Sequence, residues 1–68
     1  MIKEDVGKRI KSLRMAKGIS QEDLAYKANL DRTYIAYVEN AKKNVTIETL
    51  YKITQALDIS LSDMVQYI

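Results

Sequence analysis

The stretch from residue 21 to residue 40, QEDLAYKANLDRTYIAYVEN, constrains the fold more than any other part of the chain. Read with a helical period, it divides into two short helices over residues 21–28 and 32–39. Between them, Asn29 tolerates the left-handed backbone conformation that ends a helix, and Asp31 is a favourable N-cap for the next one. The apolar residues that share one face of each helix are Leu24, Ala25 and Ala28 in the first and Ile35 and Val38 in the second. The stretch therefore predicts two helices that cross closely at a tight corner.

Three further helical patterns flank this corner. The N-terminal pattern covers residues 3–17 and is followed by Gly18, which favours a left-handed C-terminal cap. Thr46 and Ser60 are favourable N-caps for two more helices, the last of which is expected to cover residues 61–67. The apolar residues expected to face the core in these helices are Ile2, Val6, Ile10 and Leu13, then Ile47, Leu50, Ile53 and Leu57, and finally Leu61, Met64, Val65 and Ile68. Because no alternating strand pattern competes with these, the chain is predicted to be all-α, with five short helices.

Composition narrows the function of this chain, which we expect to form a single compact domain over residues 1–68. The chain contains no histidine and no cysteine, so the commonest general base, the commonest zinc ligands and disulfides are all missing. We therefore expect a binding protein rather than an enzyme, with no metal and no cofactor. No apolar run reaches the length of a membrane span, and the N-terminal residues are too charged for a signal peptide, which favours the cytoplasm. A core this small often needs a further stabilising element, and oligomerisation is the one left.

Charge is distributed unevenly along the chain, although the net charge is only +2. Residues 1–18 carry six basic and two acidic side chains, and residues 32–44 carry three basic and one acidic. The intervening segment 19–31 and the final segment 45–68 each carry one basic and three acidic side chains. The basic excess therefore accompanies the first and third predicted helices, and a polyanion is expected to bind on that side.

Two short helices joined by a tight corner are typical of a helix-turn-helix motif, whose second helix enters the major groove of double-stranded DNA. The candidates for reading bases lie opposite the inward face of that helix and are Arg32, Thr33, Ala36 and Tyr37. Arg32 can donate two hydrogen bonds to guanine, and Thr33 can contact a base through its hydroxyl or its methyl group. The candidates for contacts with the DNA backbone are Gln21, Tyr34, Asn40, Lys42, Lys43 and Asn44.

Several side chains near this motif also admit a structural explanation. Tyr37 is large for an outer face and is consistent with a half-buried ring that packs on its neighbours. Tyr34 lies between the inner and outer faces, so its ring can pack on the domain while its hydroxyl reaches a phosphate. Gln21 is also consistent with an ordinary exposed residue in the first turn of a helix. Arg14 and Glu39 are predicted to face each other where the first and third helices meet, and a partly buried ion pair there would fix their orientation.

The segment GISQEDLAYKANLDRTYIAYVEN resembles the Cro/C1-type helix-turn-helix family of phage repressors and bacterial regulators. Within that family, QEDLAYKANLDRTYI followed by VEN and a short basic loop looks most like the controller proteins of restriction–modification systems. The resemblance implies a lambda-repressor-like fold and a small dimeric regulator of the restriction enzyme gene and of its own gene. It also implies that Arg32 and Thr33 read bases, whereas Ala36 and Tyr37 depart from the residues usual in that group. A phage-type repressor, an antitoxin and an interaction module without DNA binding are the alternatives.

The resemblance further implies dimerisation through the last two helices. The apolar residues there that exceed the needs of a small core form the predicted dimer interface and are Ile59, Leu61, Met64, Val65 and Ile68. The alternative is that these residues only complete the core of the monomer. A dimer would place two recognition helices about 34 Å apart, one turn of DNA, and would bind a near-palindromic operator. RNA polymerase is compatible with this function as a further partner, although no residue identifies it.

Overall fold

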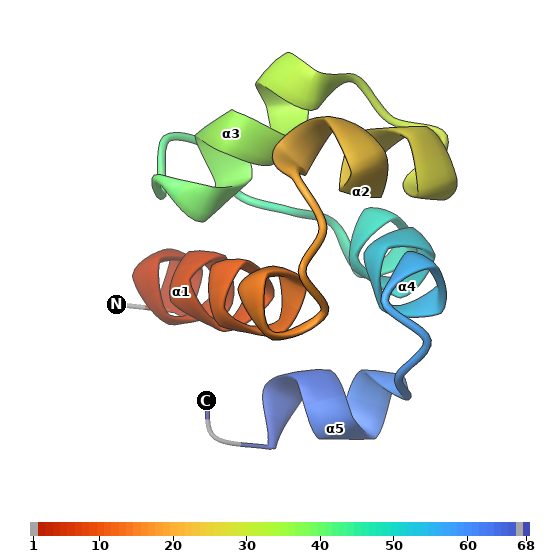
Figure 1. Cartoon of the computed structure of the whole chain (residues 1–68). Helices are drawn as coiled ribbons and strands as arrows, with labels where there is room; N and C mark the ends of the chain where they lie inside the picture. The colour runs from red at the N-terminus through yellow and green to blue at the C-terminus, as the bar shows by residue number, and fades with distance from the viewer. Residues whose placement is uncertain (1, 67) are drawn as a thin grey trace.

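The computed structural model describes residues 2–66 and 68, and within these residues every regular element is an α-helix. The five helices are α1 (Ile2–Ala16), α2 (Gln21–Ala28), α3 (Arg32–Glu39), α4 (Ile47–Ala56) and α5 (Leu61–Val65). In Figure 1, α2 and α3 lie together at the top of the molecule, with α1, α4 and α5 beneath them. Contacts between α1 and α3 and between α2 and α4 join the two parts, and α5 packs against both α1 and α4 in the lower part. The predicted all-α class is confirmed.

The helix bounds agree closely with the prediction in the middle of the chain and less closely at its ends. The bounds of α2 and α3 coincide with the predicted ranges, and α1 begins and ends one residue earlier than predicted. The last helix ends at Val65 rather than at residue 67, and residue 67 itself lies outside the described residues. Local signals fix α2 at both ends, through the Ser20 cap and the left-handed Asn29, whereas α1 and α5 have such a signal at one end only.

Four of the helices begin at a residue whose side chain binds a backbone N–H group of the first turn. At the start of α2, the Ser20 hydroxyl accepts the Asp23 N–H at 3.0 Å, and the Asp23 carboxylate accepts the Ser20 N–H at 3.1 Å. This reciprocal pair is a capping box. The backbone N–H of Ser20, followed by its hydroxyl, lowers the pKa of the Asp23 carboxyl below its ordinary value. The other capping residues are Asp31, Thr46 and Ser60, so the predicted N-caps are confirmed.

Left-handed residues turn the chain after the first four helices. Gly18 has φ of 71°, Asn29 of 57° and Asp58 of 60°. Glycine, asparagine and aspartate are the residues that adopt this conformation most readily, which explains why α1, α2 and α4 stop where they do. Ala41 also has a left-handed conformation, with φ of 59° just after α3, but this conformation is unfavourable for alanine because its Cβ is crowded. The turn after α3 is therefore held by its surroundings and not by local preference.

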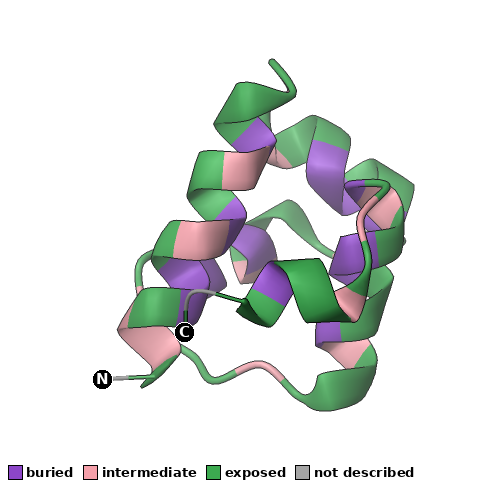
Figure 2. Ribbon diagram, turned by 90° about the horizontal axis from the view of Figure 1, so that it is seen from below, coloured by how far each residue is buried: buried purple, intermediate pink, exposed green. Residues whose placement is uncertain are grey.

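The core lies where the inner faces of the five helices meet, as the purple bands in Figure 2 show. Its fully buried apolar side chains are Ile10, Leu24, Ile35, Ile53, Leu57 and Met64. The prediction was wrong for Ile2 and Ile47, which are 74% and 69% exposed, and for Val65 and Ile68, which are 42% and 43% exposed. Ile2 and Ile47 are the first residues of their helices, and Val65 is the last of its helix. A helix end projects past the neighbouring elements, so sharing a stripe with core residues does not ensure burial.

Gly7, which is buried within α1, permits the close approach of that helix to α3. A Cβ atom at this position would lie 2.5 Å from the Val38 carbonyl oxygen and 2.8 Å from the Glu39 carbonyl oxygen. Both neighbours are backbone atoms and cannot turn aside. Glycine has a lower helix propensity than alanine, but here it allows α1 to contact the last turn of α3.

Candidate nucleic-acid interface

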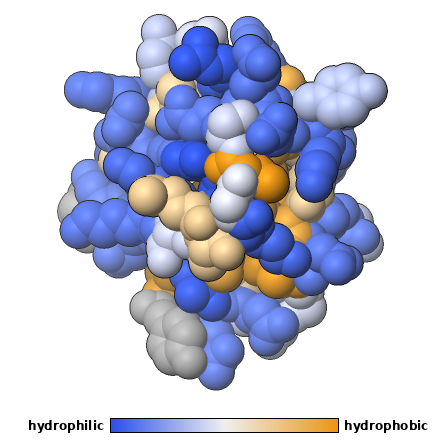
Figure 3. All heavy atoms as spheres, viewed as in Figure 1, coloured by the Kyte–Doolittle hydropathy of each residue, from blue (hydrophilic) through white to orange (hydrophobic). Residues whose placement is uncertain are grey.

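The outer face of α3 is accessible along its whole length. Arg32 and Thr33 in the first turn and Asn40 at the C-cap are exposed, Ala36 is half-buried and Tyr37 is 44% exposed. The inner face is buried and consists of Ile35, Val38 and Glu39. In the space-filling view, the upper part of the molecule, where α2 and α3 lie, is mostly hydrophilic (Figure 3). The helix thus offers its candidate base-reading side chains to a partner while its other side is anchored in the fold.

Arg14, Glu39 and Gln21 join three helices beneath this face. Arg14 Nε lies 2.7 Å from Glu39 Oε2, and Arg14 Nη2 lies 3.1 Å from Glu39 Oε1, so the predicted ion pair is present. The side chains are 11% and 1% exposed respectively. The hydrogen bonds to Glu39 raise the pKa of the Arg14 guanidinium, which therefore stays charged. Arg14 Nη1 also donates to the Ile19 carbonyl oxygen at 2.9 Å, so one guanidinium ties α1 to α3 and to the segment before α2.

Two residues predicted to contact the DNA backbone are partly enclosed. Gln21 is half-buried, and its Nε2 donates to Glu39 Oε1 at 3.1 Å. It is therefore not an ordinary exposed residue in the first turn of a helix. A side-chain amide has a second hydrogen, and the first turn of α2 offers backbone N–H groups, so a phosphate contact stays a prediction. Tyr34 is half-buried and packs against the core, consistent with the expected placement of its ring.

The loop after α3 folds back over the last turn of that helix. The Ala41 N–H donates to the Val38 carbonyl oxygen at 3.1 Å, and the Lys42 N–H donates to the Tyr37 carbonyl oxygen at 2.7 Å. Lys42, Lys43 and Asn44 are all exposed. Lys43 Nζ lies 5.8 Å from the centre of the Tyr37 ring, within the range of a cation–π contact. The basic loop therefore lies beside the C-terminal half of α3, on the flank of the candidate interface.

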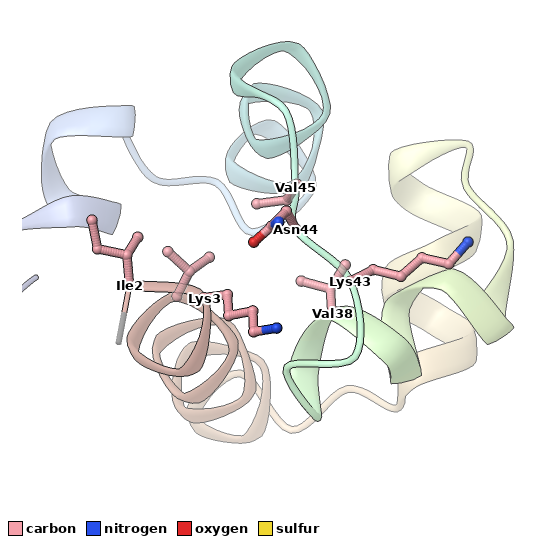
Figure 4. Close-up of a pocket in the computed structure, with 7 residues that line it drawn as sticks. Ile2, Lys3, Val38, Lys43, Asn44 and Val45 are labelled. Atoms are coloured by element: carbon pink, nitrogen blue, oxygen red, sulfur yellow. The ribbon is translucent and has the colours of Figure 1, made fainter.

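A small hollow lies between the first turns of α1 and this loop, and it offers little chemistry. Its walls are formed by Ile2, Lys3, Val6, Val38, Lys43, Asn44 and Val45 (Figure 4). The Lys43 side chain extends away from the hollow. Within residues 2–66 and 68, no group of acidic, histidine or cysteine side chains is arranged to hold a metal ion. In the same part of the chain, no helix is both long and apolar enough to span a membrane.

The predicted dimer interface requires a correction. Met64 is fully buried in the core of the monomer, so its side chain is not available to a partner as we had predicted. Ile59 and Leu61 are half-buried and pack against the core. Of the predicted set, this leaves Val65 and Ile68 as substantially exposed apolar residues.

Three residues on or in contact with the last two helices have surroundings that the sequence patterns did not predict. Ile47 and Tyr51 are 69% and 53% exposed and lie four residues apart, so they share an outer face of α4. Their spacing could have indicated a second apolar stripe beside the core stripe. Arg9 donates from Nε to the Met64 carbonyl oxygen at 3.2 Å and from Nη2 to the Asp63 carbonyl oxygen at 2.8 Å. No local signal indicates this contact, because Arg9 and its partners are more than fifty residues apart in the sequence.

Known proteins resemble this chain both in sequence and in fold. A family model described as helix-turn-helix matches residues 10–64, which include α2, α3 and α4 in full. The chain therefore belongs to the helix-turn-helix family.

Its relatives within that family include controller proteins of restriction–modification systems. The chain is 44% identical over 64 residues to control protein C.MunI of Mycoplasma sp, a match that covers 93% of this chain and 86% of C.MunI. The controller protein C.Esp1396I, solved as a tetramer with its natural 35 base-pair operator, superimposes with a TM-score of 0.92 at 42% identity, covering 97% and 87% of the two chains. C.AhdI from Aeromonas hydrophila gives a TM-score of 0.89 at 40% identity, covering 91% and 94%. The chain thus groups with these controller proteins, and the predicted family is confirmed.

Proposed function

We propose that this chain is a sequence-specific DNA-binding regulator of transcription that acts in the cytoplasm as the controller of a restriction–modification system. The observation that supports this most directly is the exposed outer face of α3, whose inner side is anchored by the Arg14–Glu39 ion pair. The relatives support it as well, since C.Esp1396I is 42% identical and forms a tetramer on its operator. The protein binds and does not catalyse, and the proposal includes no cofactor.

Base reading is assigned to the outer face of α3. Arg32, in the first turn, donates two hydrogen bonds to the O6 and N7 atoms of a guanine, which is worth about 1–3 kcal/mol of discrimination. Thr33 contacts a neighbouring base through its hydroxyl or its methyl group. Ala36 is short, so it allows close approach of the helix and contact with a thymine methyl. Tyr37, which was also predicted to read a base, is left out of this assignment because its ring faces the Lys43 ammonium group.

Contacts with phosphates surround this reading face and fix its register on the duplex. The residues assigned to them are Gln21, Tyr34, Asn40, Lys42, Lys43 and Asn44. Gln21 acts mainly through the first turn of α2, because its side chain already donates to Glu39. Lys42 and Lys43 act as point charges from the loop, and they contribute affinity without reading sequence.

The regulator is proposed to bind DNA as a homodimer. Four exposed apolar side chains on or after the last two helices are the assigned interface, namely Ile47, Tyr51, Val65 and Ile68. Covering apolar surface in this way supplies the further stabilisation that a core of this size needs. A two-fold axis between the subunits would set two copies of α3 about 34 Å apart and dictate a near-palindromic operator.

The first experiment is the selection of bound sites from a random duplex library with purified protein at physiological salt. We expect enrichment of a near-palindromic motif whose half-sites are centred about one DNA turn apart. No enrichment at any salt concentration would refute DNA recognition and favour an interaction module. A reporter gene behind the selected site then distinguishes repression from activation, and activation would require a contact with RNA polymerase.

Substitution of Arg32 tests the role of the reading face. Arg32→Ala should relax the preference at one base pair of each half-site, raising Kd for the preferred base by about 5–150-fold. Arg32→Lys keeps the charge and loses the two-pronged geometry, so it should relax the same base pair while retaining more of the non-specific affinity. Lys11→Ala, on the exposed side of α1, is the control for loss of charge. Unchanged base preference in both Arg32 variants would contradict the assignment.

A further inference from the structure

We infer that Tyr37 is a positioning residue for Lys43, whose ammonium group it holds over its ring beside the DNA backbone. The inference deepens the proposed function and rests on it, since it concerns how the phosphate contact of the loop is built. It also separates Tyr37 from Arg32 and Thr33, the two residues proposed to read bases from the first turn of α3. The argument combines the path of the backbone, the contact itself and the exposure of the two side chains.

The path of the backbone places Lys43 independently of its side chain. The 2.7 Å hydrogen bond from the Lys42 N–H to the Tyr37 carbonyl oxygen closes the last turn of α3 onto the loop. The bond from the Ala41 N–H to Val38 and the left-handed conformation of Ala41 complete the turn. Because the residue before Lys43 is bonded to the backbone of Tyr37 itself, the lysine emerges directly beside the tyrosine ring.

The contact then selects one direction for a flexible side chain. Lysine has four rotatable carbon–carbon bonds and a strongly hydrated ammonium group, so a free loop lysine samples many positions. Here Nζ lies 5.8 Å from the centre of the Tyr37 ring, where the negative face of the ring attracts a cation. Figure 4 shows the Lys43 side chain extending away from the hollow behind it, and Tyr37 lies on the outer face of α3. The ammonium is therefore held on the side where α3 is assigned to meet DNA.

Exposure indicates that the ring serves this contact and not the core. Tyr37 is 44% exposed, and it is not among the residues packed against the core cluster, whereas Tyr34 is. One face of the Tyr37 ring contacts the Lys43 ammonium group. This group is proposed to bind a phosphate, and a phosphate contact does not distinguish one base sequence from another. Loss of the ring should accordingly weaken binding to all sequences alike.

A double-mutant cycle on the selected operator tests the inference. Tyr37→Leu should raise Kd about 2–5-fold on the operator and on each of its single-base variants, the factor that corresponds to an exposed cation–π contact. Tyr37→Phe keeps the ring and should restore the affinity lost in the leucine variant. In a Lys43→Ala background Tyr37→Leu should have no further effect, whereas in a Lys42→Ala background it should cost the same factor as in the wild type.

Either of two binding results would overturn the inference, and a third would overturn the function on which it rests. A change in base preference in Tyr37→Leu would make Tyr37 a reader of bases, and an equal cost in the Lys43→Ala background would uncouple the pair. The absence of any DNA binding by the wild type would instead refute the proposed function. The contact itself is tested without DNA, because the ring shifts the NMR signals of the Lys43 methylene protons next to Nζ. That shift should persist in Tyr37→Phe and vanish in Tyr37→Leu, and its absence from the wild type would also overturn the inference.

Discussion

Replacing Glu39 by glutamine should destabilise the fold, because it removes one charge of a buried ion pair. The Glu39 carboxylate accepts hydrogen bonds from Arg14 Nε at 2.7 Å, from Arg14 Nη2 at 3.1 Å and from Gln21 Nε2 at 3.1 Å. Glutamine has nearly the same shape, but it carries no charge and replaces one acceptor oxygen with a donor nitrogen. A donor would then face donors, and the guanidinium of Arg14 would be left without its counter-charge.

The magnitude follows from how deeply the pair is buried. Removing one partner of a buried ion pair costs about 3–5 kcal/mol, because the other charge stays desolvated. Arg14 keeps its bond to the Ile19 carbonyl oxygen, and its side chain is 11% exposed, so we expect the lower end, about 3 kcal/mol. A chain of 68 residues unfolds with about 3–10 kcal/mol in total. Glu39→Gln should therefore remove a third or more of the stability.

The assay is urea denaturation followed by far-ultraviolet circular dichroism at fixed protein concentration, since assembly would make stability depend on concentration. Glu48→Gln is the matched control, because it makes the same chemical change in an exposed first-turn residue of α4 and should cost less than about 1 kcal/mol. Arg14→Met combined with Glu39→Met should recover most of the loss, since it removes both charges. If Glu39→Gln costs no more than Glu48→Gln, the reasoning from buried charge is wrong.

Three further predictions concern backbone geometry and acid stability. Gly7→Ala should destabilise the protein by about 2 kcal/mol, observed as a lower thermal midpoint, because the new Cβ would lie 2.5 Å from the Val38 carbonyl oxygen; a higher midpoint would mean that helix propensity outweighs the clash. Ala41→Gly should stabilise it by about 0.5–1 kcal/mol in urea denaturation, since glycine relieves the left-handed strain at φ of 59°; a loss of stability would show that Ala41 is not strained. The pKa of Asp23 lies below its ordinary value of 3.8, chiefly because its carboxylate accepts the Ser20 N–H. Its contribution to stability is therefore complete above the ordinary value and is lost as the pH falls through the lower folded value. An NMR titration checks this, Asp23→Asn should abolish that part of the acid dependence, and a pKa at or above 3.8 would contradict the capping argument.

The sequence predicted the centre of the fold well because the signals there are local. Ser20 and Asp31 cap α2 and α3 through atoms two or three residues away, and Asn29 adopts the left-handed conformation between them. Such interactions are decided within a single turn of the chain, so residue type and spacing suffice to identify them. The family could be predicted for the same reason, since the resemblance lies in the segment that contains α2 and α3.

Burial was harder to predict because it depends on where a neighbouring element ends. Helical periodicity places Ile47 on the same stripe as Leu50, yet the first is 69% exposed and the second is 4% exposed. Likewise, the sequence offers no reason to distinguish Met64, which is fully buried, from its neighbour Val65, which is 42% exposed. A period states which residues share a face, and only the tertiary arrangement states how far the opposing surface extends along it.

The charged residues divide by a physical rule that the sequence alone does not reveal. The Arg14 guanidinium donates hydrogen bonds to Glu39 and to the Ile19 carbonyl oxygen, and the Arg9 guanidinium donates to backbone carbonyls of α5. Both arginines therefore stabilise the fold. Arg32 and Lys43 are exposed. Basic residues that are already paired within the chain cannot offer the same hydrogen bonds to a phosphate, so the count of basic residues in the N-terminal segment overstates what that segment can give to DNA. The affinity should instead depend on the few basic groups around α3, and their removal should lower the salt dependence of binding by about one ion per lysine. Stability and affinity are then carried by different charges, which is why substitutions such as Glu39→Gln and Arg32→Lys can test them separately.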